Sequence, residues 1–179
     1  MKLTLYQVKN NFIPGRYIEH KSDKIEYFIY GKGWKKTKDY EKKEIEIAET
    51  DIDNLLAIHK FAKKYGKMAA LELTTNHPLC WRQTAVTVAA NAEIKFLEKL
   101  TRLNQILKND NPIRFISWIP AQFGLVMFDI VAVEEYLASL DPSYDKENSS
   151  LKEYLKIKYP EAAKIVESLL EKAVFNQKN

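Results

Sequence analysis

The tightest group of reactive side chains in the sequence is His77, Cys80 and Arg82, which fall within six consecutive residues. Pro78 stands among them and is typical of the first turn of a helix. At that position the helix dipole would stabilise the Cys80 thiolate and make it nucleophilic. Free cysteines are also commonly buried as small apolar side chains, and in that case His77 would cap the helix. Since burial explains Cys80 without any partner group, we assign no catalytic residue.

A second candidate group is Asp39, Glu41 and Lys43, which alternate along the chain and would share one face of a strand. The set is similar to the two acids and one lysine of metal-dependent nucleases. Such a site needs its carboxylates to converge on Mg²⁺ in a cleft. Here the acids alternate with lysines, which is typical of a solvated face. We therefore assign no metal-binding residue.

The common catalytic and cofactor motifs are absent, including G-x-G-x-x-G, the Walker lysine loop, G-x-S-x-G and H-E-x-x-H. His20, His59 and His77 are 39 and 18 residues apart, so no two lie on one helical turn as metal ligands. We expect no cofactor. The alternative function is a small enzyme with a non-local active site, such as a metal-dependent nuclease or hydrolase. Its pocket would bring together two or more of His59, His77, Glu72, Asp129 and Arg114.

Positive charge is concentrated in residues 1–44, which hold eleven Lys or Arg against six Asp or Glu, while the whole chain carries a net charge of +4. Lysine ammonium groups bind phosphates with release of counterions, and aromatic rings provide flat faces on which unpaired bases stack. A lysine-rich hairpin also keeps an edge strand from pairing with other chains. The candidate contact residues are Lys32, Trp34, Lys35, Lys36, Lys38, Tyr40, Lys42 and Lys43.

These features predict a non-catalytic intracellular protein that binds another macromolecule. It would act as a subunit or regulator of a protein complex, or contact nucleic acid through a basic aromatic β-hairpin. The pI of about 8.9 lies just below the value of about 9 typical of nucleic-acid-binding domains, so a protein partner stays open. Such a partner would bind apolar surface of the long helix described below or of residues 113–128, and a second copy of the chain is a candidate.

The composition, 46% hydrophobic and 29% charged with five glycines, is that of a folded chain and excludes a disordered or fibrous one. A length of 179 residues predicts a single domain over residues 1–179, since domains average roughly 150 residues. Cys80 is the only cysteine, which excludes an internal disulfide and favours the cytoplasm. The apolar stretch 115–128 is shorter than the ~20 residues of a membrane-spanning helix, so we expect no membrane association.

The elements segregate along the chain, which predicts an α+β fold with an N-terminal antiparallel β-meander over about residues 2–48 packed on a helical remainder. Alternating residues indicate the strands, and Gly31 and Gly33 suit the turn between two of them. A helix is expected over 51–65, with a capping pattern at Thr50–Asp53 and a glycine stop at Gly66. Residues 68–73 fit either a short strand or the start of more helix.

An apolar seam at steps of three and four predicts one long helix over about 79–108. Its length of about 45 Å exceeds the diameter of a small domain, so the helix would bend, break near Asn91 or be covered by several partners. Residues 109–112 predict a loop and 113–119 a strand, while 120–140 fits a helix less firmly because of Gly124. The polar residues 141–149 are a candidate sub-boundary. A capping box at Ser150–Glu153 and Pro160 predict a C-terminal helix pair.

Overall fold

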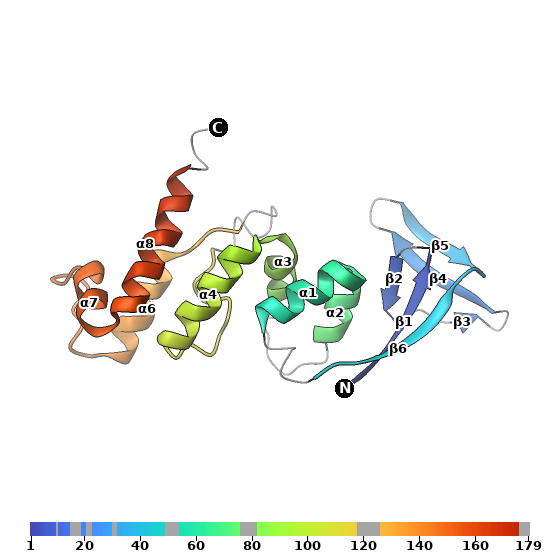
Figure 1. Ribbon diagram of the computed structural model, residues 1–179, viewed down its shortest axis with the longest axis horizontal. Coiled ribbons are helices and arrows are strands. Elements are labelled where there is room, and N and C mark those ends of the chain that lie inside the picture. The colour runs from blue at the N-terminus through green and yellow to red at the C-terminus, as the bar shows by residue number, and fades with distance from the viewer. Residues whose placement is uncertain are drawn as a thin grey trace. The chain divides into compact units, whose positions relative to one another are not determined.

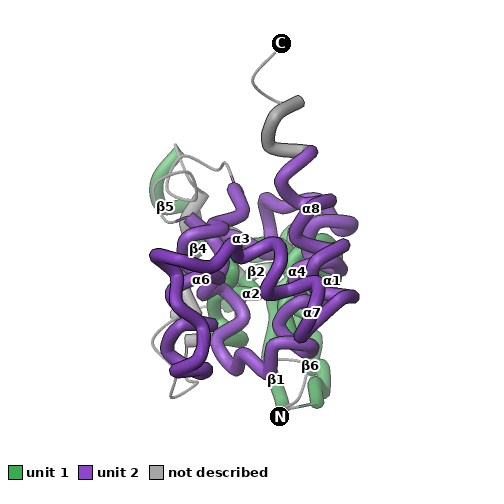
Figure 2. Tube along the Cα trace, turned by 90° about the vertical axis from the view of Figure 1, so that its left-hand side faces the viewer, with its two compact units in different colours: residues 1–86 green, residues 87–179 purple. Residues whose placement is uncertain are grey.

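The computed structural model describes residues 1–9, 11–14, 19–20, 23–29, 32–48, 54–75, 82–117 and 126–175. The chain divides into two compact units, residues 1–86 and 87–179, which are described separately (Figure 2). The polar segment 141–149 lies within the second unit. The single domain therefore stays a prediction.

The predicted α+β class is confirmed, with strands first and helices afterwards (Figure 1). The strands pair antiparallel as expected, but they form two three-stranded sheets of order β2-β1-β6 and β3-β4-β5 instead of one continuous meander. Their bounds are β1 Lys2–Val8, β2 Asn11–Pro14, β3 Glu19–His20, β4 Lys24–Ile29, β5 Gly33–Thr37 and β6 Glu41–Glu46. Pro14 is compatible with its strand because β2 lies at a sheet edge, where a residue without an N–H is tolerated.

Strand β1 buries side chains on both of its faces. Leu3 and Leu5 point to one face and form a cluster with apolar side chains of two helices. Tyr6 and Val8 point to the other face and pack with Ile25 of β4. The β2-β1-β6 sheet is therefore the middle layer of the first unit, with the helices on one side and the β3-β4-β5 sheet on the other. Burying each large aliphatic side chain contributes roughly 1.5–3 kcal/mol.

The helices that pack against this sheet are α1 Leu55–Tyr65 and α2 Lys67–Thr75. The expected helix over 51–65 starts later, because the Asn54 side chain is its N-cap and accepts hydrogen bonds from the N–H groups of Leu56 (3.0 Å) and Ala57 (3.4 Å). The predicted cap at Thr50–Asp53 lies outside the described residues. Gly66 ends α1 with a φ of 95°, as expected. The ambiguous segment 68–73 is helical and buries Ala69 and Leu73 against β1.

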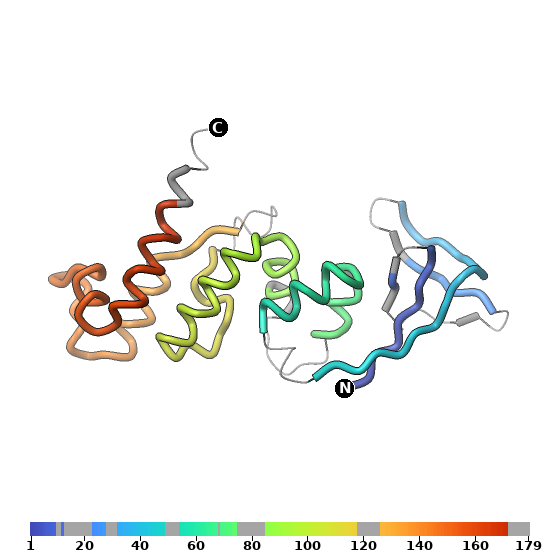
Figure 3. The backbone as a smooth tube through the Cα atoms, in the orientation of Figure 1, coloured from blue at the N-terminus to red at the C-terminus, as the bar shows by residue number. Residues whose placement is uncertain are grey.

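The predicted long helix is two helices, α3 Arg82–Asn91 and α4 Ile94–Ile106, and the break near Asn91 is confirmed (Figure 3). Glu93 has an extended backbone, with a ψ of 142°, and turns the chain between them. Helix α4 buries Leu97, Leu100 and Leu103. Residues 79–81 lie outside the described part of the chain.

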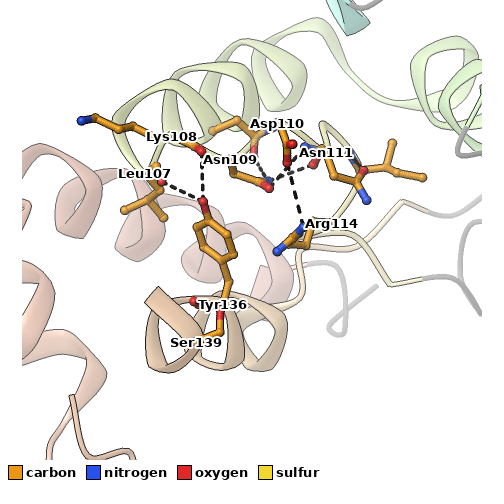
Figure 4. Close-up of polar contacts among 10 residues, drawn as sticks. Leu107, Lys108, Asn109, Asp110, Asn111, Arg114, Tyr136 and Ser139 are labelled. Atoms are coloured by element: carbon orange, nitrogen blue, oxygen red, sulfur yellow. Dashed lines mark hydrogen bonds and ion pairs between the residues drawn. The ribbon is translucent and has the colours of Figure 1, made fainter. Parts of the chain in front are cut away.

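Helix α4 ends in a Schellman motif, in which Lys108 has a positive φ of 53° and the Asn109 N–H donates to the carbonyl of Asn104 (2.8 Å). The side chains of Asn104 and Asn109 are buried and bonded to each other (2.8 Å). The Tyr136 hydroxyl lies 3.1 Å and 3.0 Å from the carbonyl oxygens of Leu107 and Lys108 (Figure 4). These polar groups fix the predicted loop after α4.

The predicted strand over 113–119 is wrong for its described part. Residues 112–115 form a turn, and Ile116 makes only an isolated bridge to Phe128. Phe115 and Ile116 are both buried although they are adjacent, which a strand with one wet face does not allow. Of the helix expected over 120–140, residues 120–125 lie outside the described part of the chain, and the helical part is α6 Ile130–Leu140. It is capped by the Asp129 carboxylate, which accepts from the Ala132 N–H (3.1 Å).

The C-terminal helix pair is confirmed as α7 Leu151–Lys158 and α8 Pro160–Phe175. Ser150 is the N-cap of α7 as predicted, but its side chain makes no capping hydrogen bond. Arg102 of α4 forms a bidentate ion pair with Glu161 of α8 at 2.7 and 2.9 Å. Among the described residues, no helix is long and apolar enough to cross a membrane.

We expect Tyr136→Phe to lower the free energy of unfolding by about 1–2 kcal/mol, because it removes the donor that the buried end of α4 uses. Urea titration followed by circular dichroism measures the change. Tyr65→Phe is the matched control: within the described residues the Tyr65 hydroxyl makes no hydrogen bond, so its loss should change stability by less than about 0.5 kcal/mol. Equal effects of the two variants would contradict this role of Tyr136.

The Asp141 carboxylate accepts hydrogen bonds from the hydroxyl and N–H of Ser143 and from the Tyr154 hydroxyl (2.7 Å). These bonds, with the Ser143 hydroxyl as the largest cause, lower the pKa of Asp141 to about 2. A carboxyl whose pKa is lower in the folded state stabilises it above pH ~4, and that stabilisation is lost as the pH falls toward 2. Asp141→Asn should therefore melt at a lower temperature than wild type at pH 7.

The difference in melting temperature between wild type and Asp141→Asn should shrink as the pH is lowered from about 5 to 2, since wild-type Asp141 becomes protonated in that range. Differential scanning calorimetry across this range measures the gap. A gap that stays constant with pH would contradict the assignment of these hydrogen bonds to the ionised carboxylate.

Candidate nucleic-acid interface

Strands β4 and β5 form a hairpin whose register runs from Ile29↔Gly33 to Ile25↔Thr37 (Figure 1). Gly33 has a positive φ of 72°, which glycine adopts without strain where the second strand begins. Because side chains alternate between the two faces, Ile25 and Tyr27 share the face that packs against β1. The opposite face, which we call the outer face, is defined by Lys24, Glu26, Trp34 and Lys36.

Trp34 is the most exposed aromatic side chain of the described residues, with 64% of its surface accessible. It stands on the outer face next to the turn of the hairpin. Lys36 follows on the same face and forms an ion pair with Glu26, which lies directly opposite it on β4. The exposed ring of Trp34 therefore presents a flat apolar face with the positive charge of Lys36 nearby.

The lysines near Trp34 differ in how their charge is used. Lys32 and Lys35 are exposed, and no ion pair within the described residues involves either of them. Lys38 pairs with Asp23 at 3.4 Å beyond the far end of the hairpin. The ammonium groups of Lys32 and Lys35 are therefore available to a ligand. Those of Lys36 and Lys38 are partly compensated by nearby carboxylates.

The other three predicted contact residues do not join this surface. Tyr40 turns inward and makes an edge-to-face contact with Tyr6 (ring centroids 5.5 Å apart, 76° between planes). Lys42 and Lys43 belong to β6, which pairs with β1 in the other sheet and not with β5. They point to opposite faces of that sheet, and Lys43 lies 5.8 Å from the ring of Phe12. The basic hairpin is therefore β4–β5 alone.

Lys24 is a residue of the outer face that the sequence analysis missed. It lies two positions before Glu26 on β4, and no ion pair in the described part of the chain involves it. The signal was the spacing of two between Lys24 and Glu26, which places the lysine on the same side of the strand as Glu26. The β4–β5 register, which only the structure provides, puts Lys24 at the end of the hairpin away from Trp34.

The side chains proposed for a non-local active site do not line the described groove of the second unit. His59 is buried in α1 and Glu72 lies on α2, both in the first unit. In the second unit, Asp129 caps α6, and Arg114 lies over the ring of Tyr136 at 4.7 Å. His77 and Cys80 lie outside the described residues.

The acid and lysine set of Asp39, Glu41 and Lys43 does not form a metal centre among the described residues, where no cluster of three His, Cys, Asp or Glu side chains could hold an ion. Asp39 lies in the connection between β5 and β6, and its N–H donates to the Thr37 hydroxyl (3.0 Å). Glu41 and Lys43 lie on β6 opposite Gln7 and Leu5.

Comparison of the chain with protein-family models, curated proteins and solved structures finds no match. The function is therefore argued from the residues of the hairpin.

Proposed function

We propose that this chain is a non-catalytic macromolecule-binding protein that binds single-stranded nucleic acid through the β4–β5 hairpin. The observation that carries the proposal is the 64% exposure of Trp34 on β5, with the exposed Lys32 just before that strand and the exposed Lys35 next along it. An indole in water exposes a large apolar area, and a stacked base would cover it with a contact worth roughly 1–3 kcal/mol. Lys35 lies opposite Tyr27, on the other face of the hairpin from Trp34. Lys32, before the strand, and Lys35 add positive charge that would attract the phosphates of the nucleic acid.

Single strands fit this surface better than duplex DNA. A projecting indole stacks on bases that are already unpaired, whereas in a duplex it would first have to separate them. Sequence-specific reading of the major groove relies mainly on the bidentate guanidinium of arginine, and the described residues of the hairpin contain lysines but no arginine. We therefore expect binding that tolerates sequence changes and weakens with salt.

The cytoplasm is the proposed setting, supported by the presence of a single cysteine, Cys80, in the whole chain. Participation in a larger complex is compatible with this function, because binding a nucleic acid through unit 1 leaves the exposed apolar side chains of unit 2 for another contact.

Trp34→Ala should weaken binding of a fluorescently labelled oligothymidylate of about 16 nucleotides roughly tenfold, because the stacking face is lost. Trp34→Phe should retain most of the affinity, since a smaller aromatic face remains. Fluorescence anisotropy measures both. Absence of binding by wild type at about 50 mM salt would overturn the proposal, and cleavage of the oligonucleotide would contradict its non-catalytic part.

The double variant Lys32→Ala/Lys35→Ala should reduce the slope of log K against log salt by roughly 1 to 1.5, because two phosphate contacts on a single strand are lost. Lys42→Ala/Lys43→Ala is the matched control: it removes the same charge from the other sheet and should leave the slope unchanged. Equal slopes for the two double variants would show that only net charge matters, against a hairpin interface.

Glu26→Gln should tighten binding a few-fold and steepen the salt dependence, because it frees Lys36 from its ion pair on the outer face. Glu41→Gln on β6 makes the same change in net charge away from the hairpin and serves as the control. An equal gain in both variants, or none in Glu26→Gln, would place Lys36 outside the interface.

A further inference from the structure

Helices α6, α7 and α8 of the second unit surround an apolar groove of about 520 Å³. Its aliphatic walls are Ile130, Leu151, Leu155, Ala163, Val166 and Leu170. Leu170 is 37% exposed, whereas Leu155, Ala163 and Val166 of the same groove are themselves buried. An apolar groove with an exposed leucine beside it is a candidate place for another protein surface to bind.

The charges beside the groove indicate what that surface is. Lys164 and Glu171 both lie on the exposed side of α8, and no ion pair within the described residues involves either of them. They are seven residues apart, which places them on the same side of the helix and about 10 Å from each other along its axis. The strip along the groove thus has a positive charge at one end and a negative charge at the other.

Such a strip is complementary to itself when a second copy lies antiparallel on it. With the two-fold axis near Glu167, Lys164 faces the partner's Glu171, and Glu171 faces the partner's Lys164. A shift of the axis by about 1.5 Å along the helix places the small side chain of Ala163 opposite the partner's Leu170, which leaves room for that leucine to enter the groove. The charge pair centres the axis between residues 167 and 168, and the Ala163–Leu170 pair centres it between residues 166 and 167.

Glu167 lies near this axis, where two copies would bring like charges together. Its carboxylate is held by Lys152 at 3.0 Å, and Lys156 lies at 4.0 Å. Both lysines belong to α7, so each copy supplies the charge that compensates its own Glu167. The groove can accept an antiparallel helix without leaving an uncompensated pair of carboxylates.

We propose that α8 of a second copy of this chain fills the groove and forms a two-fold symmetric dimer. The contact places Leu170 of each copy in the groove of the other, and two Lys164–Glu171 pairs flank it. The contact lies wholly in residues 130–171 and does not depend on the nucleic-acid interface of the first unit.

Sedimentation equilibrium of the full chain from about 1 to 100 µM tests the dimer. Wild type should show a concentration-dependent dimer. Lys164→Glu and Glu171→Lys should each raise the dissociation constant roughly tenfold, because each replaces two attractions across the axis by two repulsions. The double variant Lys164→Glu/Glu171→Lys should return close to wild type, since the pairs are restored with reversed sign.

Leu170→Glu should abolish the dimer, whereas Ile157→Glu should not, because Ile157 is 80% exposed on α7 and does not line the groove. Far-ultraviolet circular dichroism checks that each variant is folded. A wild type that stays monomeric at every concentration would overturn the proposal. So would a double charge variant as weak as the single ones, or an Ile157→Glu variant as disruptive as Leu170→Glu.

Discussion

The first unit depends on the burial of both faces of β1. Leu3 and Leu5 require the helices on one side, and Tyr6 and Val8 require the second sheet on the other. Because Ile45 on β6 packs into the helix-side cluster, β6 must pair with β1. This pairing separates β6 from β5 and divides the basic segment between two sheets. Because the core holds β6 against β1, only the β4–β5 hairpin remains as the candidate interface.

Local signals predicted the elements whose ends are set by local bonds. Gly66 ends α1, and Ser150 and Pro160 start α7 and α8, because these residues act through the backbone of their own turn. The loop after α4 was predicted from its Asn and Pro residues, but the way in which that helix ends at Ile106 was not. Lys108 takes the left-handed conformation that glycine usually occupies, and the surrounding asparagines and Tyr136 hold it there. Those partners are up to 29 residues away along the chain.

The candidate interface was predictable only in part for the same reason. Trp34 and the lysines beside it are consecutive in sequence, and strand alternation alone places Trp34 and Lys36 on one face. Which lysines keep their charge depends on cross-strand partners. The β4–β5 register brings Glu26 to Lys36, and Tyr40 leaves the surface because Tyr6 lies within ring contact. Composition therefore indicated the right segment, and the pairing of strands decides which of its residues lie on the candidate interface.

The proposed dimer would compensate for the modest affinity that we expect of a single hairpin. One indole and a few lysines hold a single strand with modest affinity, and salt reduces it further. A dimer formed through α8 carries two such hairpins, so a strand long enough to reach both makes its second contact within an existing complex. The effective concentration of that second site then adds affinity without any new side chain. The small number of binding residues in each hairpin is therefore consistent with a protein that works as a pair.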